Sequence, residues 1–273
     1  VRDATASLFR DGAFAHVVHL AAQPGVRYSL VNPAAYLANN VDAFGNVLEG
    51  CRHARVAHLV YASSSSVYGA NHVLPFSEDQ RTDTPVSLYA ATKKANEMMA
   101  YSYAYLYALP ATGLRFFTVY GPWGRPDMAA MIFTRAILAG APIEVFNRGD
   151  MHRDFTYVDD IVEGVARVLA RPPAPDAATQ APHAIYNIGN NRSVPLAEFI
   201  ATLERLLARR AIRVDRPMQP GDVKDTYASI DRLAALTGFA PRTGLAEGLA
   251  AFVAWYRDYY GAGGASSTAG STP

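Results

Sequence analysis

Residues 58–69 read HLVYASSSSVYG, a short apolar run that leads directly into four serines. A run of serines is usually a solvated linker, but apolar sequence enters this one without a break, which favours the polar end of a buried strand. A second valine-rich run, HVVHLA, occupies residues 16–21, and the residues between the two runs carry apolar side chains at helical spacing. This order of strand, helix and strand predicts a parallel sheet that helices cover on both faces.

The remaining sequence continues this alternation to residue 122 and then changes. A helix is predicted over residues 86–109 and a strand over 111–119. Beyond them the pieces are shorter: predicted helices near 127–139, 159–170, 195–209 and 244–260, and predicted strands near 143–146 and 154–157. We therefore predict an α/β protein with a doubly wound parallel sheet in residues 1–122, to which later strands return, and a smaller mixed α/β lobe in 123–260. Residues 261–273, GAGGASSTAGSTP, have too few apolar side chains to form a core and are predicted to be a disordered tail.

Composition excludes several classes of protein. Hydrophobic residues make up 50% of the 273, enough for a core, and 25 Lys and Arg nearly balance 24 Asp and Glu. No strong field therefore favours nucleic acid or an anionic membrane as a partner. Cys51 is the single cysteine, which excludes an internal disulfide and a cysteine-built zinc site, and we expect no metal. No run approaches the about 20 apolar residues of a membrane span, and the first residues lack an apolar signal segment, so we expect a cytoplasmic protein.

Tyr89 and Lys93 lie four residues apart in SLYAATKKANE, residues 87–97, and therefore on one face of the predicted helix. An ammonium close to a phenol favours the phenolate and lowers the pKa of the tyrosine from its ordinary value near 10. Taken alone, such a pair arises by chance in many helices. The serine cluster changes this, because ligands of an open parallel sheet bind beyond the carboxyl ends of its strands, where the serines stand. The pair is thus a candidate general base.

Several segments, in order along the chain, resemble one family. Tyr-x-x-x-Lys with an upstream serine is similar to the extended short-chain dehydrogenase/reductase superfamily of nucleotide-sugar epimerases and dehydratases, and the likeness is greatest to the UDP-glucuronate 4-epimerases. The segments that carry it, up to residue 260, are HVVHLAAQPGVRYSL, VYASSSSVYGAN, PVSLYAATKKANE, TGLRFFTVYGPWGRPDMA, RDFTYVDDIVEG, YNIGNN, MQPGDV and FVAWYRDYY. The resemblance implies a Rossmann-like sheet, a nucleotide-sugar-binding lobe in 123–260, NAD as cofactor, a UDP-sugar as substrate and a homodimer through the helices near 33–53 and 86–109.

The resemblance also implies a reaction, the interconversion of UDP-glucuronate and UDP-galacturonate by transient oxidation at carbon 4. NAD+ takes the hydride while Tyr89 removes the hydroxyl proton, Lys93 lowers the pKa of Tyr89 and holds the nicotinamide ribose, and Ser64 hydrogen-bonds the sugar oxygen. Ser65 and Ser66 face the sugar. Related 4,6-dehydratases carry an Asp-Glu pair at these two positions and decarboxylases tend to carry Glu at the second, so the serines favour epimerisation. A UDP-glucose or UDP-N-acetylglucosamine 4-epimerase, or an inactive fragment that only binds or assembles, stays open.

Further site residues follow from the same resemblance. For the cofactor they are Leu20, Ala21, Ala22, Asn40 and Phe117. For the UDP-sugar they are Arg27 and Arg125, which would bind the carboxylate, and Thr118, Arg153, Phe155, Gln219 and Asp222.

One element of such a site is absent from this sequence. No G-x-x-G-x-x-G occurs in the 273 residues, and VRDA at the start resembles the sequence after the third strand of the family, so about 65 residues with three strands and two helices would precede it. The chain is thus expected to be a truncated piece of an epimerase, or else a short protein that binds without catalysing. We expect it to bind NAD weakly or not at all and to be poorly soluble, because the edge of the strand at 16–21 would be exposed.

Overall fold

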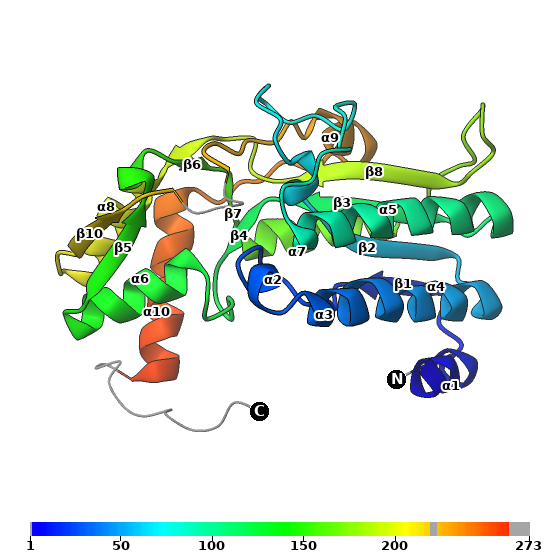
Figure 1. The fold of residues 1–273 in the computed structure, drawn as a ribbon, viewed down its shortest axis with the longest axis horizontal. Helices are drawn as coiled ribbons and strands as arrows, with labels where there is room; N and C mark the ends of the chain where they lie inside the picture. Colours follow the sequence, from blue (N-terminus) through cyan, green and yellow to red (C-terminus); the bar gives the residue numbers. More distant parts are fainter. Residues whose placement is uncertain (1, 219–222, 262–273) are drawn as a thin grey trace.

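Four parallel strands form the main sheet of the computed structural model, which describes residues 2–218 and 223–261 (Figure 1). They are β1 (His16–His19), β2 (His58–Ser64), β3 (Ala111–Phe116) and β8 (His183–Ile188), in the order β1-β2-β3-β8. All three pairings are parallel, with Leu59 opposite Ala111 and Ala111 opposite His183. A buried parallel sheet needs continuously apolar strands, which is what β2 supplies from Leu59 to Tyr61.

Helices cover both faces of this sheet, as the alternation of side chains along β2 requires. Leu59 and Tyr61 lie in one apolar core with Phe44 and Ala100, which belong to α4 (Ala43–Ala54) and α5 (Leu88–Tyr107). Val60 points the other way, into a core with residues of α7 (Val158–Leu169) and α9 (Asp231–Thr237). The predicted doubly wound, Rossmann-like sheet is therefore confirmed.

The segment before α4 is helical over much of its length. It contains α1 (Arg2–Gly12), then α2 (Tyr28–Val31), α3 (Pro33–Tyr36) and a π-helical stretch, Leu37–Asp42, that runs into α4. The side chain of Asn32 accepts a hydrogen bond from the amide of Ala35 and so caps α3, whose first residue is Pro33. Helix α1, which the sequence pattern did not predict, packs Phe9 against Gly50 of α4, where a Cβ would lie 2.3 Å from the ring.

The smaller lobe holds most of the C-terminal half and lies to the left in Figure 1. Its helices are α6 (Ala129–Ala139), α8 (Leu196–Leu207) and α10 (Leu245–Tyr260), and β5 (Pro142–Phe146) pairs in parallel with β10 (Ile212–Arg216). Phe199, Leu203 and Phe252 are fully buried between them. The lobe therefore has an apolar core of its own. The predicted tail lies outside the described residues, except for Gly261.

The chain passes between sheet and lobe several times, first at Phe117. The predicted strand 111–119 is interrupted at Phe117, so that β3 stays in the main sheet and β4 (Thr118–Tyr120) pairs with β7 (Phe155–Tyr157). Asp154, just before β7, is fully buried and accepts hydrogen bonds from the amides of Asn190 (2.6 Å) and Ala228 (3.2 Å), while its own carbonyl accepts one from the amide of Thr118 (3.1 Å). Beside it, β6 (His152–Arg153) pairs antiparallel with β9 (Val194–Pro195).

No helix among residues 2–218 and 223–261 has the length and apolar character needed to cross a bilayer.

Candidate active site

Ser64 and Tyr89 meet beyond the carboxyl end of β2. Ser64 ends the strand in an extended conformation, and its hydroxyl accepts a hydrogen bond from the amide of Ser66 (3.1 Å), which starts a 3-10 turn over Ser65–Tyr68. Ser87 caps α5 through the amide of Ala90 (3.1 Å), which places Tyr89 in the first turn of that helix. Ser64 lies near enough to Tyr89 to lower the pKa of its phenol. Two of the three predicted catalytic residues are therefore neighbours.

Lys93, the third predicted catalytic residue, lies one turn further along α5. Burial raises the pKa of the Tyr89 phenol, and the groups that oppose this are Ser64 and the charge of Arg125. The ammonium of Lys93 donates to the carbonyl oxygen of Ala62 in β2 (2.9 Å). The expectation that Lys93 lowers the pKa of Tyr89 stays a prediction. Burial lowers the pKa of Lys93 itself to about 8.

The surroundings of Lys93 fit the ribose end of a dinucleotide. An ammonium carries three N–H donors, and among the described residues only the carbonyl of Ala62 accepts from this one. Lys93 is 4% exposed, so the two remaining donors lie in a buried position that favours a hydroxyl acceptor. His19 lies close to it, and burial followed by the charge of Lys93 lowers the pKa of His19 to about 4, so this imidazole is neutral at pH 7.

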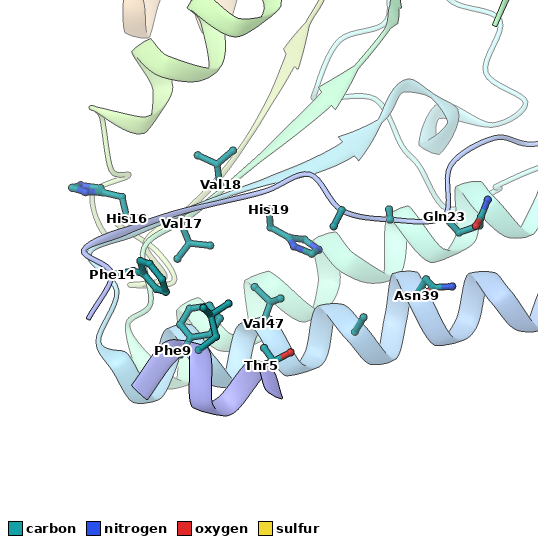
Figure 2. Close-up of a pocket in the computed structure, with 14 residues that line it drawn as sticks. Thr5, Phe9, Phe14, His16, Val17, Val18, His19, Gln23, Asn39 and Val47 are labelled. Atoms are coloured by element: carbon teal, nitrogen blue, oxygen red, sulfur yellow. The ribbon is translucent and has the colours of Figure 1, made fainter. Parts of the chain in front are cut away.

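An open cavity of about 670 Å³ runs along the free edge of β1 (Figure 2). Figure 2 shows Val17 and His19 directed from β1 toward the helix that carries Val47, and Val18 directed to the opposite face. Ala21 and Ala22, two of the predicted cofactor residues, line this cavity. Leu20 is 56% exposed and does not line it.

The other two predicted cofactor residues are used within the fold. Asn40 is buried, and its amide group binds both the N–H (2.7 Å) and the carbonyl (3.0 Å) of Gln23 and donates to Thr92 (3.1 Å). It thereby fastens the loop after β1 to α5. Phe117 is buried beside the stacked rings of Tyr68 and Phe76, 6.4 Å from the centroid of each.

Arg125 and Arg27, the predicted carboxylate ligands, come together around Asp127. Arg125 donates from Nε and Nη2 to the two carboxylate oxygens of Asp127, at 2.9 and 2.7 Å. This hydrogen-bonded pair, burial, and the charges of Arg125 and Arg27 act on Asp127, whose pKa lies below its ordinary value. The guanidinium of Arg27 also lies over the ring of Phe146 in β5, 4.7 Å from its centroid. Both cations thus stand where the sheet meets the lobe.

The remaining predicted substrate residues are spread over the lobe side of the site. Ser65 and Ser66 are half-buried next to Ser64. Thr118 lies opposite Phe155 in the β4-β7 pair, but the ring of Phe155 is 4% exposed and stacks on Phe199, so it is part of the lobe's core. Arg153 donates to the carbonyl oxygen of Lys224 (2.7 Å). Gln219 and Asp222 lie outside the described residues.

Two features of the site were not found in the sequence. Tyr36 is buried, donates to the carbonyls of Pro24 (2.8 Å) and Gly25 (2.5 Å), and sets its ring edge-on to Tyr89 at 6.0 Å. The hydrogen bonds are made by a tyrosine far from the loop in sequence, so no local pattern indicates them.

The second missed feature is the buried ion pair of Glu97 and Arg115. Both carboxylate oxygens of Glu97 accept from Arg115 (2.8 and 3.0 Å), and one also accepts from Ser63 (2.7 Å). Burial alone would raise the pKa of Glu97, but Arg115, Ser63 and Lys94 hold it below its ordinary value. Glu97 lies four residues after Lys93, a spacing that could have indicated a side chain on the same face of α5.

Comparison with known proteins agrees with this geometry. A family model described as "NAD dependent epimerase/dehydratase family" matches residues 1–189. A probable UDP-glucuronate 4-epimerase of Rhizobium meliloti is 50% identical over 255 residues, which are 89% of this chain and 75% of that protein. The crystal structure of UDP-glucuronic acid 4-epimerase from Bacillus cereus, in complex with UDP-glucuronic acid and NAD, has a TM-score of 0.84 at 32% identity, covering 94% of this chain and 79% of that one. The UDP-glucose 4-epimerase of Thermus thermophilus, in complex with NAD, also reaches 0.84, at 28% identity over 94% of this chain and 82% of its own. Because the family model spans more than half of the chain, the chain belongs to the NAD dependent epimerase/dehydratase family.

Proposed function

We propose that this protein interconverts UDP-glucuronate and UDP-galacturonate with NAD as its cofactor. The observation that carries the proposal is the position of Arg125, which lies against the same loop residue, Gly25, as Tyr36, whose ring packs on that of Tyr89. A fixed cation next to the candidate base suits a sugar that carries a carboxylate, which Arg binds through two parallel hydrogen bonds. The 50% identity to a probable UDP-glucuronate 4-epimerase supports the same substrate.

Each residue of the proposed mechanism has a separate role. NAD, when bound, supplies the group that accepts and returns the hydride. Tyr89 takes the proton of the 4-hydroxyl as hydride leaves carbon 4, and gives it back after hydride has returned to the other face of the 4-keto sugar. Ser64, which neighbours Tyr89, holds the sugar oxygen in line with the phenol. Lys93 offers its two remaining N–H donors to the ribose hydroxyls.

Ser65 and Ser66 support epimerisation over related reactions. Both are half-buried beside Ser64 and neither can act as an acid or base at neutral pH. A 4-keto sugar held here meets no carboxylate at these two positions to remove a further proton or to assist decarboxylation. Return of the hydride is then the open route.

Proton NMR of the reaction products tests the proposal. The protein, expressed from its complete reading frame, is incubated with NAD+ and UDP-glucuronate. UDP-galacturonate should accumulate to an equilibrium mixture. UDP-xylose or a stable 4-keto sugar as the product would show that the chain carries out another reaction of its family.

The variant Arg125→Ala tests whether the substrate is the carboxylated sugar or a neutral one. We expect kcat/KM for UDP-glucuronate to fall by about 100-fold or more, because a charged hydrogen-bonding partner of the carboxylate is lost. Turnover of UDP-glucose, if measurable, should change little. Equal losses on both substrates, or no loss on either, would favour a UDP-glucose or UDP-N-acetylglucosamine 4-epimerase. The structurally similar Thermus thermophilus protein is a UDP-glucose 4-epimerase.

We further propose a homodimer formed through α5. Its outer face exposes Met98 (59%), Tyr101 (38%) and Tyr105 (58%), which recur at helical spacing and so form an apolar stripe. Tyr105→Glu places a charge in this stripe and is expected to convert the dimer to a monomer, as measured by light scattering after size exclusion. Val162→Glu, at an equally exposed position (59%) on α7, is the matched control and should keep the dimer mass. An unchanged mass for both variants contradicts an interface at α5.

The other residues of the predicted site stay proposals. Ala21 and Ala22 are assigned to the cofactor, and Thr118 and Arg153 to the UDP-sugar. The cytoplasmic location and the weak NAD binding expected of the 273-residue chain also stay predictions from the sequence.

A further inference from the structure

Asp127 binds Arg125, a predicted substrate residue, through both of its carboxylate oxygens. These accept from Nε and Nη2 of Arg125, so the two planar groups face each other edge to edge. The two residues are separated by Pro126, which limits the backbone conformations between them. Such a fork fixes not only the position but also the plane of a guanidinium.

The fork leaves one edge of Arg125 available. A guanidinium has five N–H donors, and Asp127 takes the one on Nε and one on Nη2. The two on Nη1 and the second on Nη2 have no acceptor among the described residues. That edge is again two parallel donors, the arrangement that binds a second carboxylate. Arg125 can therefore hold Asp127 on one side and a carboxylated ligand on the other.

The surroundings keep Arg125 at the catalytic end of the site. Gly25, at a φ of +93°, brings its backbone so close that a Cβ there would lie 3.4 Å from Nη2 of Arg125. Tyr36 holds this loop through the carbonyls of Pro24 and Gly25. Burial raises the pKa of both Tyr36 and Tyr89, and the charge of Arg125 opposes that rise in each.

The ion pair of Arg125 and Asp127 contributes little to the stability of the fold. The side chains of Arg125 and Asp127 are 40% and 64% exposed, and pairs of this kind add little to the free energy of unfolding because water already solvates both charges. We therefore infer that this bidentate, half-exposed pair serves to bind a ligand rather than to stabilise the fold.

We propose that Asp127 is a positioning residue that determines specificity for the carboxylated sugar: it fixes the guanidinium plane of Arg125 so that the opposite edge receives the substrate's carboxylate. This inference rests on the proposed function. It assigns Asp127 no contact with the substrate and no part in proton transfer.

Steady-state kinetics of Asp127→Asn test the proposal. Asn keeps the size of the side chain but offers one acceptor and no charge, so the guanidinium plane is released. We expect KM for UDP-glucuronate to rise about tenfold with kcat within a factor of about two, because an interaction made equally in ground and transition states is weakened. Kinetic constants for UDP-glucose should stay as in the wild type. Asp127→Glu, which keeps a carboxylate, should recover part of the loss.

The chain contains a matched control. Arg81 and Asp83 form a pair with the same spacing, in which Nε and Nη2 of Arg81 both donate to one oxygen of Asp83 (3.0 and 2.7 Å), on the exposed loop before α5. Asp83→Asn should leave all kinetic constants unchanged.

Two results for Asp127→Asn would overturn the proposal. One is a lower KM for UDP-glucuronate, since Asp127 would then compete with the substrate for Arg125. The other is an equal effect on both sugars. If the wild type converts UDP-glucuronate and Asp127→Asn matches it, this inference alone fails; if the wild type does not discriminate in favour of the uronate, the proposed function fails with it.

Discussion

Tyr89→Phe is expected to lower kcat for epimerisation by about 1,000-fold or more, which is what the loss of a positioned general base costs. The substitution removes one oxygen atom, the one that lies near Ser64 and in our proposal takes the proton of the 4-hydroxyl. Lys93 keeps its hydrogen bond to the carbonyl oxygen of Ala62 in this variant, so the fold around the site is retained. Initial rates of UDP-galacturonate formation, measured by NMR, give kcat directly.

Tyr101→Phe is the matched control for this variant. Tyr101 lies on the same helix but is 38% exposed on its outer face, so its hydroxyl has no role in the chemistry. We expect wild-type kcat for Tyr101→Phe, and the same urea midpoint for both variants and the wild type. If Tyr89→Phe kept more than about a tenth of wild-type kcat, the base would have to be another residue, and Lys93, whose pKa burial lowers to about 8, would be the next to test.

The largest loss of stability is expected from Glu97→Ala. The side chains of Glu97 and Arg115 are both 4% exposed, so removing the carboxylate leaves a guanidinium charge buried without its partner. Breaking a buried pair in this way costs about 3–5 kcal/mol of the free energy of unfolding. Ser63, which donates to the same carboxylate, loses its partner as well. Urea denaturation followed by circular dichroism measures the change.

An exposed pair provides the comparison. Glu163 and Arg167 bind each other one turn apart on α7, with side chains 42% and 33% exposed. Glu163→Ala should cost less than about 1 kcal/mol, because water solvates the arginine that remains. Equal losses in the two variants would mean that Arg115 finds another partner, or that water reaches it.

Site residues could be predicted from the sequence where they lie on a regular strand or helix. Ser64 could be placed because apolar residues lead into it, and Tyr89 with Lys93 because a helix brings residues four apart to one face. Helical spacing gives the face but not the direction in which a long side chain turns. Lys93 was therefore placed correctly on α5, but the contact of its ammonium with the carbonyl oxygen of Ala62 in β2 could not be predicted.

Side-chain contacts between different elements could not be predicted in the same way. Tyr36 of α3 donates to the carbonyls of Pro24 and Gly25, and Arg115 of β3 binds Glu97 of α5, and these groups meet only after folding. The strand β8 was also missed. It follows a stretch rich in Pro and Ala, and its sequence, HAIYNI, alternates too little to separate it from that loop.

Asp154 has a consequence for how the protein moves. Three separate stretches of chain, at Thr118, Asn190 and Ala228, bind this one buried residue where they lie between the sheet and the lobe. A hinge needs residues that can change their backbone angles freely, whereas here the crossing strands are fastened to a common point. We therefore expect the sheet and the lobe to move together as one rigid body. The rate at which the nucleotide sugar binds and leaves should then depend on the motion of the surrounding loops. Amide hydrogen exchange would then be slow at the crossing and fast in the loops, whatever ligand is present.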